Sequence, residues 1–170
     1  MVDAGTLRWR AATKADLSEI FRISKIIHAD IPERMETYEE KLALSPTSCF
    51  VVDDGKSIRG YAITLPWAAR QIPKLDTILG ALPPDAPALY IHDVALLPSA
   101  RSLGLVKELM ELLDAAGIRL GLREMSLAAV YGSETTWFQY GFRRTEMSDA
   151  LKAQAATYGS AVFMTRPIRG

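Results

Sequence analysis

The sequence has one cysteine, Cys49, and only two histidines among its 170 residues. A lone cysteine cannot form an internal disulfide, and the chain holds no cluster of Cys and His that would bind zinc. A chain of this length buries roughly two-thirds of its unfolded surface, so its core needs neither kind of cross-link. We therefore expect no bound metal, a reducing cytoplasmic setting, and a core position for Cys49 in its hydrophobic strand.

An excess of charge of either sign is also lacking, because 20 Lys and Arg residues balance 20 Asp and Glu residues. A zero net charge provides no overall field that would attract nucleic acid or an anionic membrane surface. No stretch approaches 18 consecutive apolar residues, and the first 17 residues lack the apolar segment of a secretory signal. We expect a protein that neither spans a membrane nor is secreted, and that has no nucleic-acid partner.

Hydrophobic periodicity predicts alternating strands and helices, with no internal repeat and no linker. Helices are expected over 13–28, 32–44, 105–121 and 133–141, and strands over 6–11, 48–52, 60–65, 89–97, 126–130, 142–147 and 160–166. Residues 67–88, rich in Pro and Ala, form the longest irregular connection, and such connections are often functional. The order of elements predicts one mixed α/β domain over residues 1–170, with a βαβ unit in its middle.

Residues 96–107 pass from a buried strand through a tight loop into a helix, with the sequence Leu-Leu-Pro-Ser-Ala-Arg-Ser-Leu-Gly-Leu-Val-Lys. Such a passage directs free backbone N–H groups and the positive end of the helix dipole at one spot, where an anion of phosphate size would bind. The stretch is not a P-loop, because no Gly-Lys-Ser/Thr closes it. Its single glycine also excludes a dinucleotide-binding fingerprint.

Two motifs in this part of the chain resemble those of a known family. Arg101-x-x-Gly104-x-Val106, preceded by Ala95-Leu96-x-Pro98, resembles the acetyl-CoA loop of the GCN5-related N-acetyltransferases, the GNAT family. Trp137-Phe-Gln-Tyr-Gly-Phe142 resembles the Tyr-x-x-x-Gly-Phe signature of the same family. With the order of elements, the resemblance covers essentially the whole chain. It implies a single GNAT-like domain with a central mixed β-sheet that is splayed open and flanked by helices.

The resemblance implies that acetyl-CoA is the cosubstrate, and it implies which residues would hold it. The pantetheine arm would pair with the backbone of residues 94–96, and the pyrophosphate would lie on the amides of about residues 102–107. The implied cofactor-binding residues are Val94, Ala95, Leu96, Arg101, Ser102, Leu103, Gly104, Leu105, Val106, Lys107, Ser133 and Trp137.

Two residues depart from the family pattern. Val106 stands where the family has Gly or Ala, so we expect weaker binding of CoA, although valine keeps its main-chain donor. Trp137 stands where many members carry the tyrosine that protonates the leaving thiolate, and an indole N–H is far too weak an acid for that step. Tyr131 and Tyr140 are candidate replacements, with solvent as the alternative proton donor and ring packing as the alternative role of both tyrosines.

His92 is the candidate general base, because it interrupts an apolar strand and its unperturbed pKa of about 6.5 suits proton abstraction near neutral pH. The arylalkylamine-type acetyltransferases carry a histidine at this strand position, which adds to the resemblance. The alternative is a buried neutral histidine with a hydrogen-bonding partner. Strand alternation places Tyr90 on the face of His92, either in a proton path or in the core, and Asp93 on the opposite face.

The resemblance places acceptor specificity in residues 28–34 and in the connection that begins at Pro66. Asp30 and Glu33 would hold the positive charge of an amine, unless they serve only as helix caps, and Trp67 would stack on an apolar body. The predicted function is direct transfer of an acetyl group from acetyl-CoA to a small-molecule or peptide amine. The alternatives are a non-catalytic acyl-CoA-binding or sensing module and an unrelated phosphate-ligand protein. Pairing into a homodimer through edge strands is a family expectation.

Overall fold

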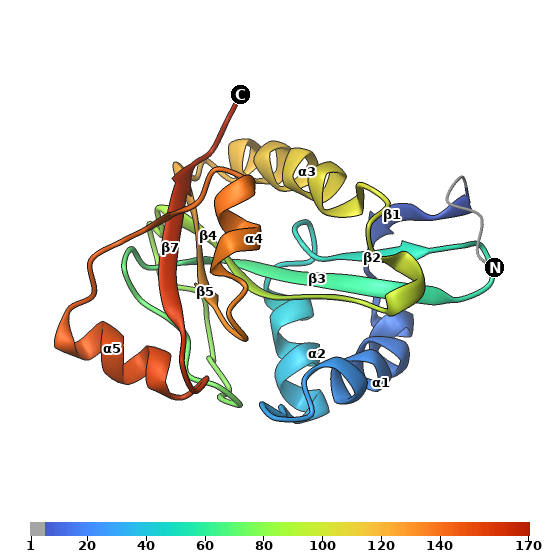
Figure 1. Cartoon of the computed structure of the whole chain (residues 1–170), viewed down its shortest axis with the longest axis horizontal. Coiled ribbons are helices and arrows are strands. Elements are labelled where there is room, and N and C mark those ends of the chain that lie inside the picture. The colour runs from blue at the N-terminus through green and yellow to red at the C-terminus, as the bar shows by residue number, and fades with distance from the viewer. Residues whose placement is uncertain (1–5) are drawn as a thin grey trace.

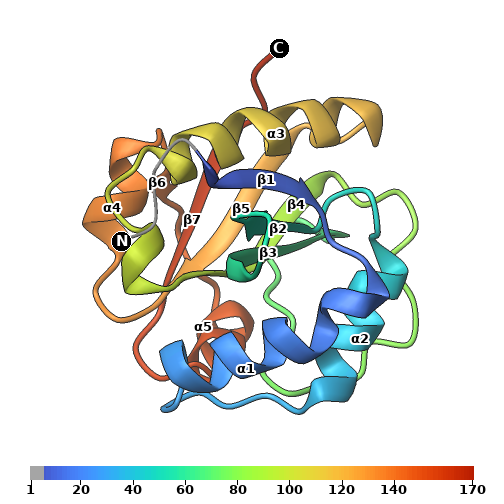
Figure 2. The same cartoon turned by 90° about the vertical axis from the view of Figure 1, so that its right-hand side faces the viewer.

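A seven-stranded sheet lies between two layers of helices in the computed structural model, which describes residues 6–170 (Figures 1 and 2). The spatial order of the strands is β1-β2-β3-β4-β5-β7-β6, and only β4 and β5 pair in parallel. The strands are β1 (Arg8–Ala11), β2 (Phe50–Asp53), β3 (Ile58–Trp67), β4 (Ala88–Leu96), β5 (Glu124–Ala129), β6 (Arg143–Arg144) and β7 (Val162–Pro167). The predicted mixed α/β domain is confirmed, and residues 1–5 of its predicted span lie outside the described residues.

The helices are α1 (Leu17–Ile27), α2 (Met35–Leu44), α3 (Leu105–Arg119), α4 (Glu134–Gln139) and α5 (Asp149–Ala156). Figure 2 shows α3 above the sheet and α1, α2 and α5 below it. Leu17, Ile20 and Ile23 recur at helical spacing and are buried, so they hold α1 against the sheet. No helix within residues 6–170 combines the length and the apolar character that crossing a membrane requires.

The sheet separates two main hydrophobic clusters. On the α3 side, Leu109 and Leu113 pack with Phe142, and all three side chains are fully buried. On the α1–α2 side, Ile20 packs in a cluster with Cys49. Cys49 is therefore a core residue, as predicted, and burial raises the pKa of its thiol to about 12. A thiol in this environment stays protonated at neutral pH and is unreactive.

The sheet is splayed at its centre, as the family resemblance implies. Pairing between β4 and β5 covers only residues 88–91 of β4 and 124–127 of β5. Beyond Ile91, β4 continues to Leu96 and pairs only with β3. One edge of residues 92–96 therefore has no strand beside it, and the space between the diverging strands is available to a ligand.

A β-bulge at His92 changes which side chains share a face of the sheet. Ile63 lies opposite Asp93 while Thr64 lies opposite Ile91, so His92 is an extra residue in β4. Side-chain alternation is interrupted there. His92 and Asp93 both meet residues of the α1–α2 layer, and the prediction that Asp93 faces away from His92 is wrong.

Two other parts of the chain differ from the sequence prediction. β3 does not end before Pro66 but runs to Trp67, and Pro66 pairs with Leu89 beyond the end of β2. A missing N–H is tolerated at such an unpaired strand edge. The segment 149–156, for which no helix was predicted, forms α5. Ser148 caps it by accepting a hydrogen bond from the Leu151 N–H at 3.1 Å.

Gly60 provides a test of the packing between β3 and β4. It lies opposite Leu96, and a Cβ at this position would lie 2.7 Å from the carbonyl oxygen of Ala95. Gly60→Ala is expected to lower the free energy of unfolding by about 1–3 kcal/mol, because backbone must shift to make room. Urea denaturation measures this change.

Gly117→Ala is the matched control, because a Cβ in this α3 position meets only the side chain of Ile168, whose end can move. Alanine also has the higher helix propensity by about 1 kcal/mol. The control variant should therefore be nearly as stable as the parent or more stable. Equal destabilisation by both substitutions would contradict the close approach of β3 and β4.

Candidate functional site

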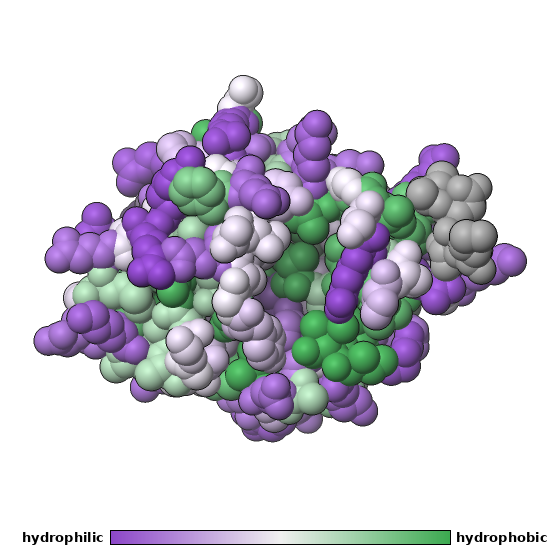
Figure 3. Space-filling model, viewed as in Figure 1, coloured by the Kyte–Doolittle hydropathy of each residue, from purple (hydrophilic) through white to green (hydrophobic). Residues whose placement is uncertain are grey.

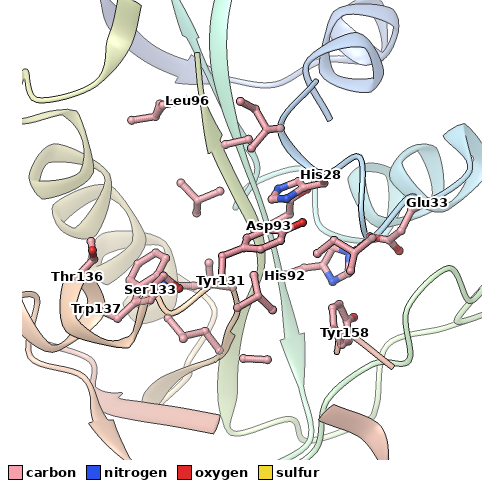
Figure 4. Close-up of a pocket in the computed structure, with 18 of the residues that line it drawn as sticks. His28, Glu33, His92, Asp93, Leu96, Tyr131, Ser133, Thr136, Trp137 and Tyr158 are labelled. Carbon is pink, nitrogen blue, oxygen red and sulfur yellow. Dashed lines mark hydrogen bonds and ion pairs between the residues drawn. The ribbon is translucent and has the colours of Figure 1, made fainter. Parts of the chain in front are cut away.

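A cavity of about 300 Å³ opens where β4 and β5 diverge. Figure 3 shows a hollow near the middle of this face, with hydrophobic residues inside it. Figure 4 shows that α4 contributes Thr136 and Trp137 on one side, while the end of α1 and the loop after it contribute His28 and Glu33 on the other. β4 lies between the two sides. The cavity thus joins predicted CoA-binding residues to Glu33, one of the three predicted acceptor-binding residues.

His92 and Glu33 form a buried pair inside this cavity. His92 Nε2 lies 2.7 Å from Glu33 Oε1, and the two side chains are 1% and 4% exposed. Burial alone would raise the pKa of Glu33. The charge and hydrogen bond of His92, the charge of Lys41 and the backbone N–H of Asp76 together lower this pKa to about 2. Glu33 is therefore an anion at any working pH.

The carboxylate of Glu33 fixes the state of the His92 ring. An acceptor at Nε2 favours the tautomer that carries its proton there, which leaves a lone pair on Nδ1. Within residues 6–170, nothing hydrogen-bonds to this buried Nδ1. Glu33 is thus not the exposed acidic residue that was predicted to bind an amine. It is the partner of the predicted base.

A second carboxylate, that of Asp93, is held by three side chains. His28 Nε2 lies 2.6 Å from Oδ1, while Tyr61 and Tyr38 donate their hydroxyl protons to Oδ2 at 2.5 and 3.3 Å. Burial lowers the pKa of His28, but the hydrogen bond and charge of Asp93 outweigh it and raise this pKa overall. Asp93 therefore stabilises the protonated form of His28.

Four tyrosines are among the described residues that line the cavity, and three of them have engaged hydroxyl groups. Tyr38 donates to Asp93, Tyr158 donates to the carbonyl of Pro73 at 2.6 Å, and the Tyr90 hydroxyl bonds to Tyr158 and to the backbone of Ala128. Burial raises the pKa of all three phenols. Tyr90 is also 1% exposed and lies in the core.

Tyr131, the fourth tyrosine, is 56% exposed. Its backbone has a φ of 55°, which is uncommon for a bulky residue, and this conformation turns the chain after β5. Its ring stacks on His28, with the ring centroids 5.9 Å apart and the planes 7° apart. No partner within residues 6–170 hydrogen-bonds to its hydroxyl group. Burial, followed by the charges of Asp30 and Asp93, raises the pKa of this phenol.

The predicted CoA loop forms the turn between β4 and α3. Seven of the twelve predicted cofactor-binding residues line the cavity, namely Val94, Ala95, Leu96, Arg101, Val106, Ser133 and Trp137. Ser102, Leu103 and Gly104 form the turn, while Leu105 and Lys107 lie in the first turn of α3. Gly104 has a φ of 77°, and a Cβ there would meet no atom within 4 Å. The turn therefore leaves open space in front of the N–H groups that begin α3.

Two side chains hold this turn in place. The Arg101 guanidinium donates from Nε to the carbonyl of Leu96 at 3.0 Å, and the Trp9 indole donates to the carbonyl of Leu105 at 2.8 Å. The open turn, the N-terminus of α3 and the unpaired edge of β4 fit an extended ligand with a phosphate group, such as CoA. Val106 lines the cavity beside them.

Among the predicted catalytic and acceptor-binding residues, three do not line the cavity. Asp30 is exposed on the loop after α1. Trp67 ends β3 and packs against a core cluster near α5, and Tyr140 packs edge-on against Trp137 at 6.4 Å between ring centroids. Trp67 was predicted from the connection after Pro66 and Tyr140 from its nearness to Trp137 in sequence, but both rings fill hydrophobic space. The structure therefore does not support Trp67 as an acceptor contact or Tyr140 as a proton donor.

The sequence analysis did not predict the pairing of His28 with Asp93, or that Tyr158 lines the cavity. His28 was expected as the end of a helix and as part of the acceptor segment 28–34, but with no partner, and Tyr158 follows α5, which was not predicted. The two partners of the His28–Asp93 pair are 65 residues apart. The one local signal was the polarity of Asp93 inside an apolar strand.

The comparisons with known proteins agree with the fold. Residues 14–137 match the model of a family described as the acetyltransferase (GNAT) family. Ard1 from Thermoplasma volcanium is 15% identical over 97% of this chain and 99% of that chain, with a TM-score of 0.73. The ribosomal-protein-S18-alanine N-acetyltransferase from Escherichia coli is 16% identical over 96% of this chain and 95% of that chain, with a TM-score of 0.64.

A third solved structure, the GNAT-like decarboxylase GphF in complex with isobutyryl-CoA, is 16% identical over 95% of this chain and 100% of that chain, with a TM-score of 0.75. No curated protein matches the sequence. At these identities the solved structures show the fold, whereas the family model covers more than half of the chain. The chain belongs to the acetyltransferase (GNAT) family.

Proposed function

We propose that the protein is an acetyl-CoA-dependent N-acyltransferase that transfers an acetyl group directly to an amine. The observation that carries this proposal is the cavity between the diverging strands β4 and β5. The predicted CoA-binding turn lies at one end of the cavity, and the buried His92–Glu33 pair lies at the other. A ligand along the free edge of β4 would bring its thioester close to the bulge at His92. Holding two reactants together in this way supplies much of the rate of a transfer reaction.

His92 acts as the general base in this proposal. Glu33 accepts the hydrogen bond of the Nε2–H group, so the lone pair of His92 is on Nδ1. This nitrogen accepts a proton from the attacking amine, directly or through one water. The amine nitrogen forms a bond to the carbonyl carbon, and the carbon–sulfur bond breaks. Glu33 touches neither reactant and is a positioning residue. It also stabilises the imidazolium that forms when His92 takes the proton.

Tyr131 donates the proton that the leaving thiolate requires. Three observations support this assignment: its hydroxyl is free within the described residues, the ring lines the cavity opposite Trp137, and solvent can return a proton to it. The raised pKa makes this phenol a weaker acid, so the position of Tyr131 in the cavity, and not its acidity, supports the role. Stacking on His28 holds the ring in place. Trp137 then has no acid role.

The charges of the cavity favour amine transfer over the decarboxylation named for GphF. A substrate carboxylate needs a cation that is not already neutralised. His28 already has a carboxylate partner in Asp93, and His92 is neutral when it acts as the base beside Glu33. Arg101 lies at the other end of the cavity, in the predicted CoA-binding turn, where its guanidinium bonds to the carbonyl of Leu96. A neutral amine needs only an acceptor for its proton, which the Nδ1 of His92 provides.

Calorimetric titration of acetyl-CoA tests the donor site. We expect micromolar binding, about −8 kcal/mol, because the α3 N-terminus and the free edge of β4 both contribute. Phosphate and ATP, the controls, should bind more weakly. Val106→Ala should tighten the binding of acetyl-CoA, since less bulk stands beside the pyrophosphate. Absence of binding at millimolar acetyl-CoA would overturn the proposal.

Substitutions at His92 and Glu33 test the base. His92→Gln is expected to lower kcat about 10²- to 10⁴-fold without changing the affinity for acetyl-CoA. Glu33→Gln should lower kcat less, because its amide oxygen still accepts from His92 but carries no charge. Tyr90→Phe, a control on the same strand, should change kcat little. Steady-state kinetics and titration measure both quantities. Binding of acetyl-CoA with no turnover of any amine would instead favour a sensing module.

Tyr131→Phe tests the acid, because it keeps the stacked ring and removes only the hydroxyl. We expect kcat to fall about 10²-fold with unchanged affinity for acetyl-CoA. Adding Trp137→Tyr to this variant should restore much of the rate, since it returns a phenol to the family position. Tyr140→Phe serves as the control and should have no effect. A Tyr131→Phe variant with the parental kcat would mean that solvent protonates the thiolate.

A further inference from the structure

The connection between β3 and β4 crosses the acceptor end of the cavity, and its residues 72–80 are here called the strap. One end of the strap is bound to the α5 region. The Ile72 N–H donates to Gln154 Oε1 at 2.9 Å, and the Leu75 N–H donates to Thr157 Oγ1 at 3.2 Å. Tyr158 donates to Pro73, as described above. Three hydrogen bonds thus fix this end of the strap.

The other end of the strap is bound to α2 and to the loop between α1 and α2. Arg34 donates from its backbone N–H to Asp76 Oδ1 at 2.8 Å, and its guanidinium bonds to the same carboxylate at 3.1 Å. Glu40 accepts the N–H groups of Leu79 and Gly80 at 2.6 and 2.8 Å. In Figure 1 the connection from β3 to β4 lies between α5 and the α1–α2 loop. The strap is therefore hydrogen-bonded to two separate parts of the fold, the α5 region and the α1–α2 region.

Glu33 links the strap to the proposed base. Its Oε1 contacts His92, and its Oε2 accepts the backbone N–H of Asp76 at 3.0 Å. The strap also contributes Leu75 to the lining of the cavity. A change in the position of the strap would therefore move the carboxylate that orients His92. We therefore expect the strap to keep its position during the reaction.

The acceptor end of the cavity is lined mainly by apolar side chains. The whole cavity has a volume of about 300 Å³, which the reactive end of the donor would share, and this volume lies at the lower limit for ligand pockets. Ile27, Ile31 and Leu75 contribute aliphatic side chains, and Tyr158 contributes a ring. The charged side chains at this end within residues 6–170 are the two histidine–carboxylate pairs. No cation is left to receive a carboxylate from the acceptor.

We propose that the strap restricts the acceptor to a small primary amine with an apolar body and no carboxylate. The amine would lie against His92, and its apolar body would lie among Ile27, Ile31 and Leu75. Amino acids and peptide N-termini are poor acceptors on this view. An amino acid would bury an unpaired carboxylate, and a peptide would exceed the space that the donor leaves in a cavity of about 300 Å³. This inference rests on the proposed transfer reaction.

The test compares phenethylamine with phenylalanine and a tetrapeptide that begins with phenylalanine. Phenylalanine differs from phenethylamine only by the carboxylate. We expect kcat/KM for phenethylamine to exceed that of the other two by at least about a hundredfold. Leu75→Arg, which adds a cation to the lining, should narrow the ratio of phenethylamine to phenylalanine at least about tenfold. Ile78→Ala is the matched control, because Ile78 lies on the strap but is 49% exposed and does not line the cavity.

Comparable acetylation of phenylalanine or of the peptide would overturn the inference and leave the proposed transferase function intact. Product binding gives a second readout that needs no turnover. In the presence of CoA, N-acetylphenethylamine should bind more tightly than N-acetylphenylalanine by calorimetry. Equal affinities would also overturn the inference. Failure of all amines to react would count against the proposed function alone, because the product affinities still test the acceptor class.

Discussion

The carboxylate of Glu33 is the group on which the acceptor side of the cavity depends. It is buried, and removing a charge from water costs several kcal/mol unless partners replace the lost hydration. His92 and the N–H of Asp76 occupy its two oxygens. Lys41 adds a positive charge from α2, where its side chain is fully buried. The α1–α2 loop with the adjoining α2, the strap and β4 therefore meet at one anion.

Lys41 shows how closely these charges are balanced. No hydrogen-bond partner within residues 6–170 reaches its Nζ, and burial lowers the pKa of this amine while Glu33 acts in the opposite direction. Removing the Glu33 carboxylate would leave a buried cation without its compensating anion. Such a loss costs more than the pair itself contributes, because the remaining charge stays desolvated. The carboxylate of Asp93 is compensated in a similar way, by His28 and by hydrogen bonds from two tyrosine hydroxyls.

The donor half of the site could be predicted from the sequence because it is local. Arg101, Gly104 and Val106 lie within six consecutive positions, and a short pattern in a strand–loop–helix context specifies the turn. Most of the sheet and the long helices follow from periodicity for the same reason. The binding groups there are main-chain N–H groups, which almost any side chain allows. A pattern with one unusual residue, Val106, therefore still predicts the turn.

The acceptor half could not be predicted in this way. Glu33 and His92 are 59 positions apart, and Ile72 and Gln154 are 82 positions apart, so no local pattern records either contact. The bulge at His92 has the same effect on a smaller scale. The extra residue interrupts the alternation of side chains along β4. Asp93 therefore lies on the α1–α2 side of the sheet, where strict alternation from His92 would not place it. Because α5 was not predicted, the contacts that it makes with one end of the strap could not be predicted either.

The two halves place different demands on the chain. In the proposed reaction, backbone donors would bind the cosubstrate with little dependence on sequence, whereas buried charges and the strap would define the acceptor through specific side chains. A family that keeps its donor site can therefore change its acceptor by changing a few distant residues, and fold likeness at 15% identity is compatible with a different acceptor. In this chain, we propose that those residues are Glu33 with its partners and the apolar side chains of Ile27, Ile31 and Leu75. The acceptor would then depend on these side chains more than on the fold.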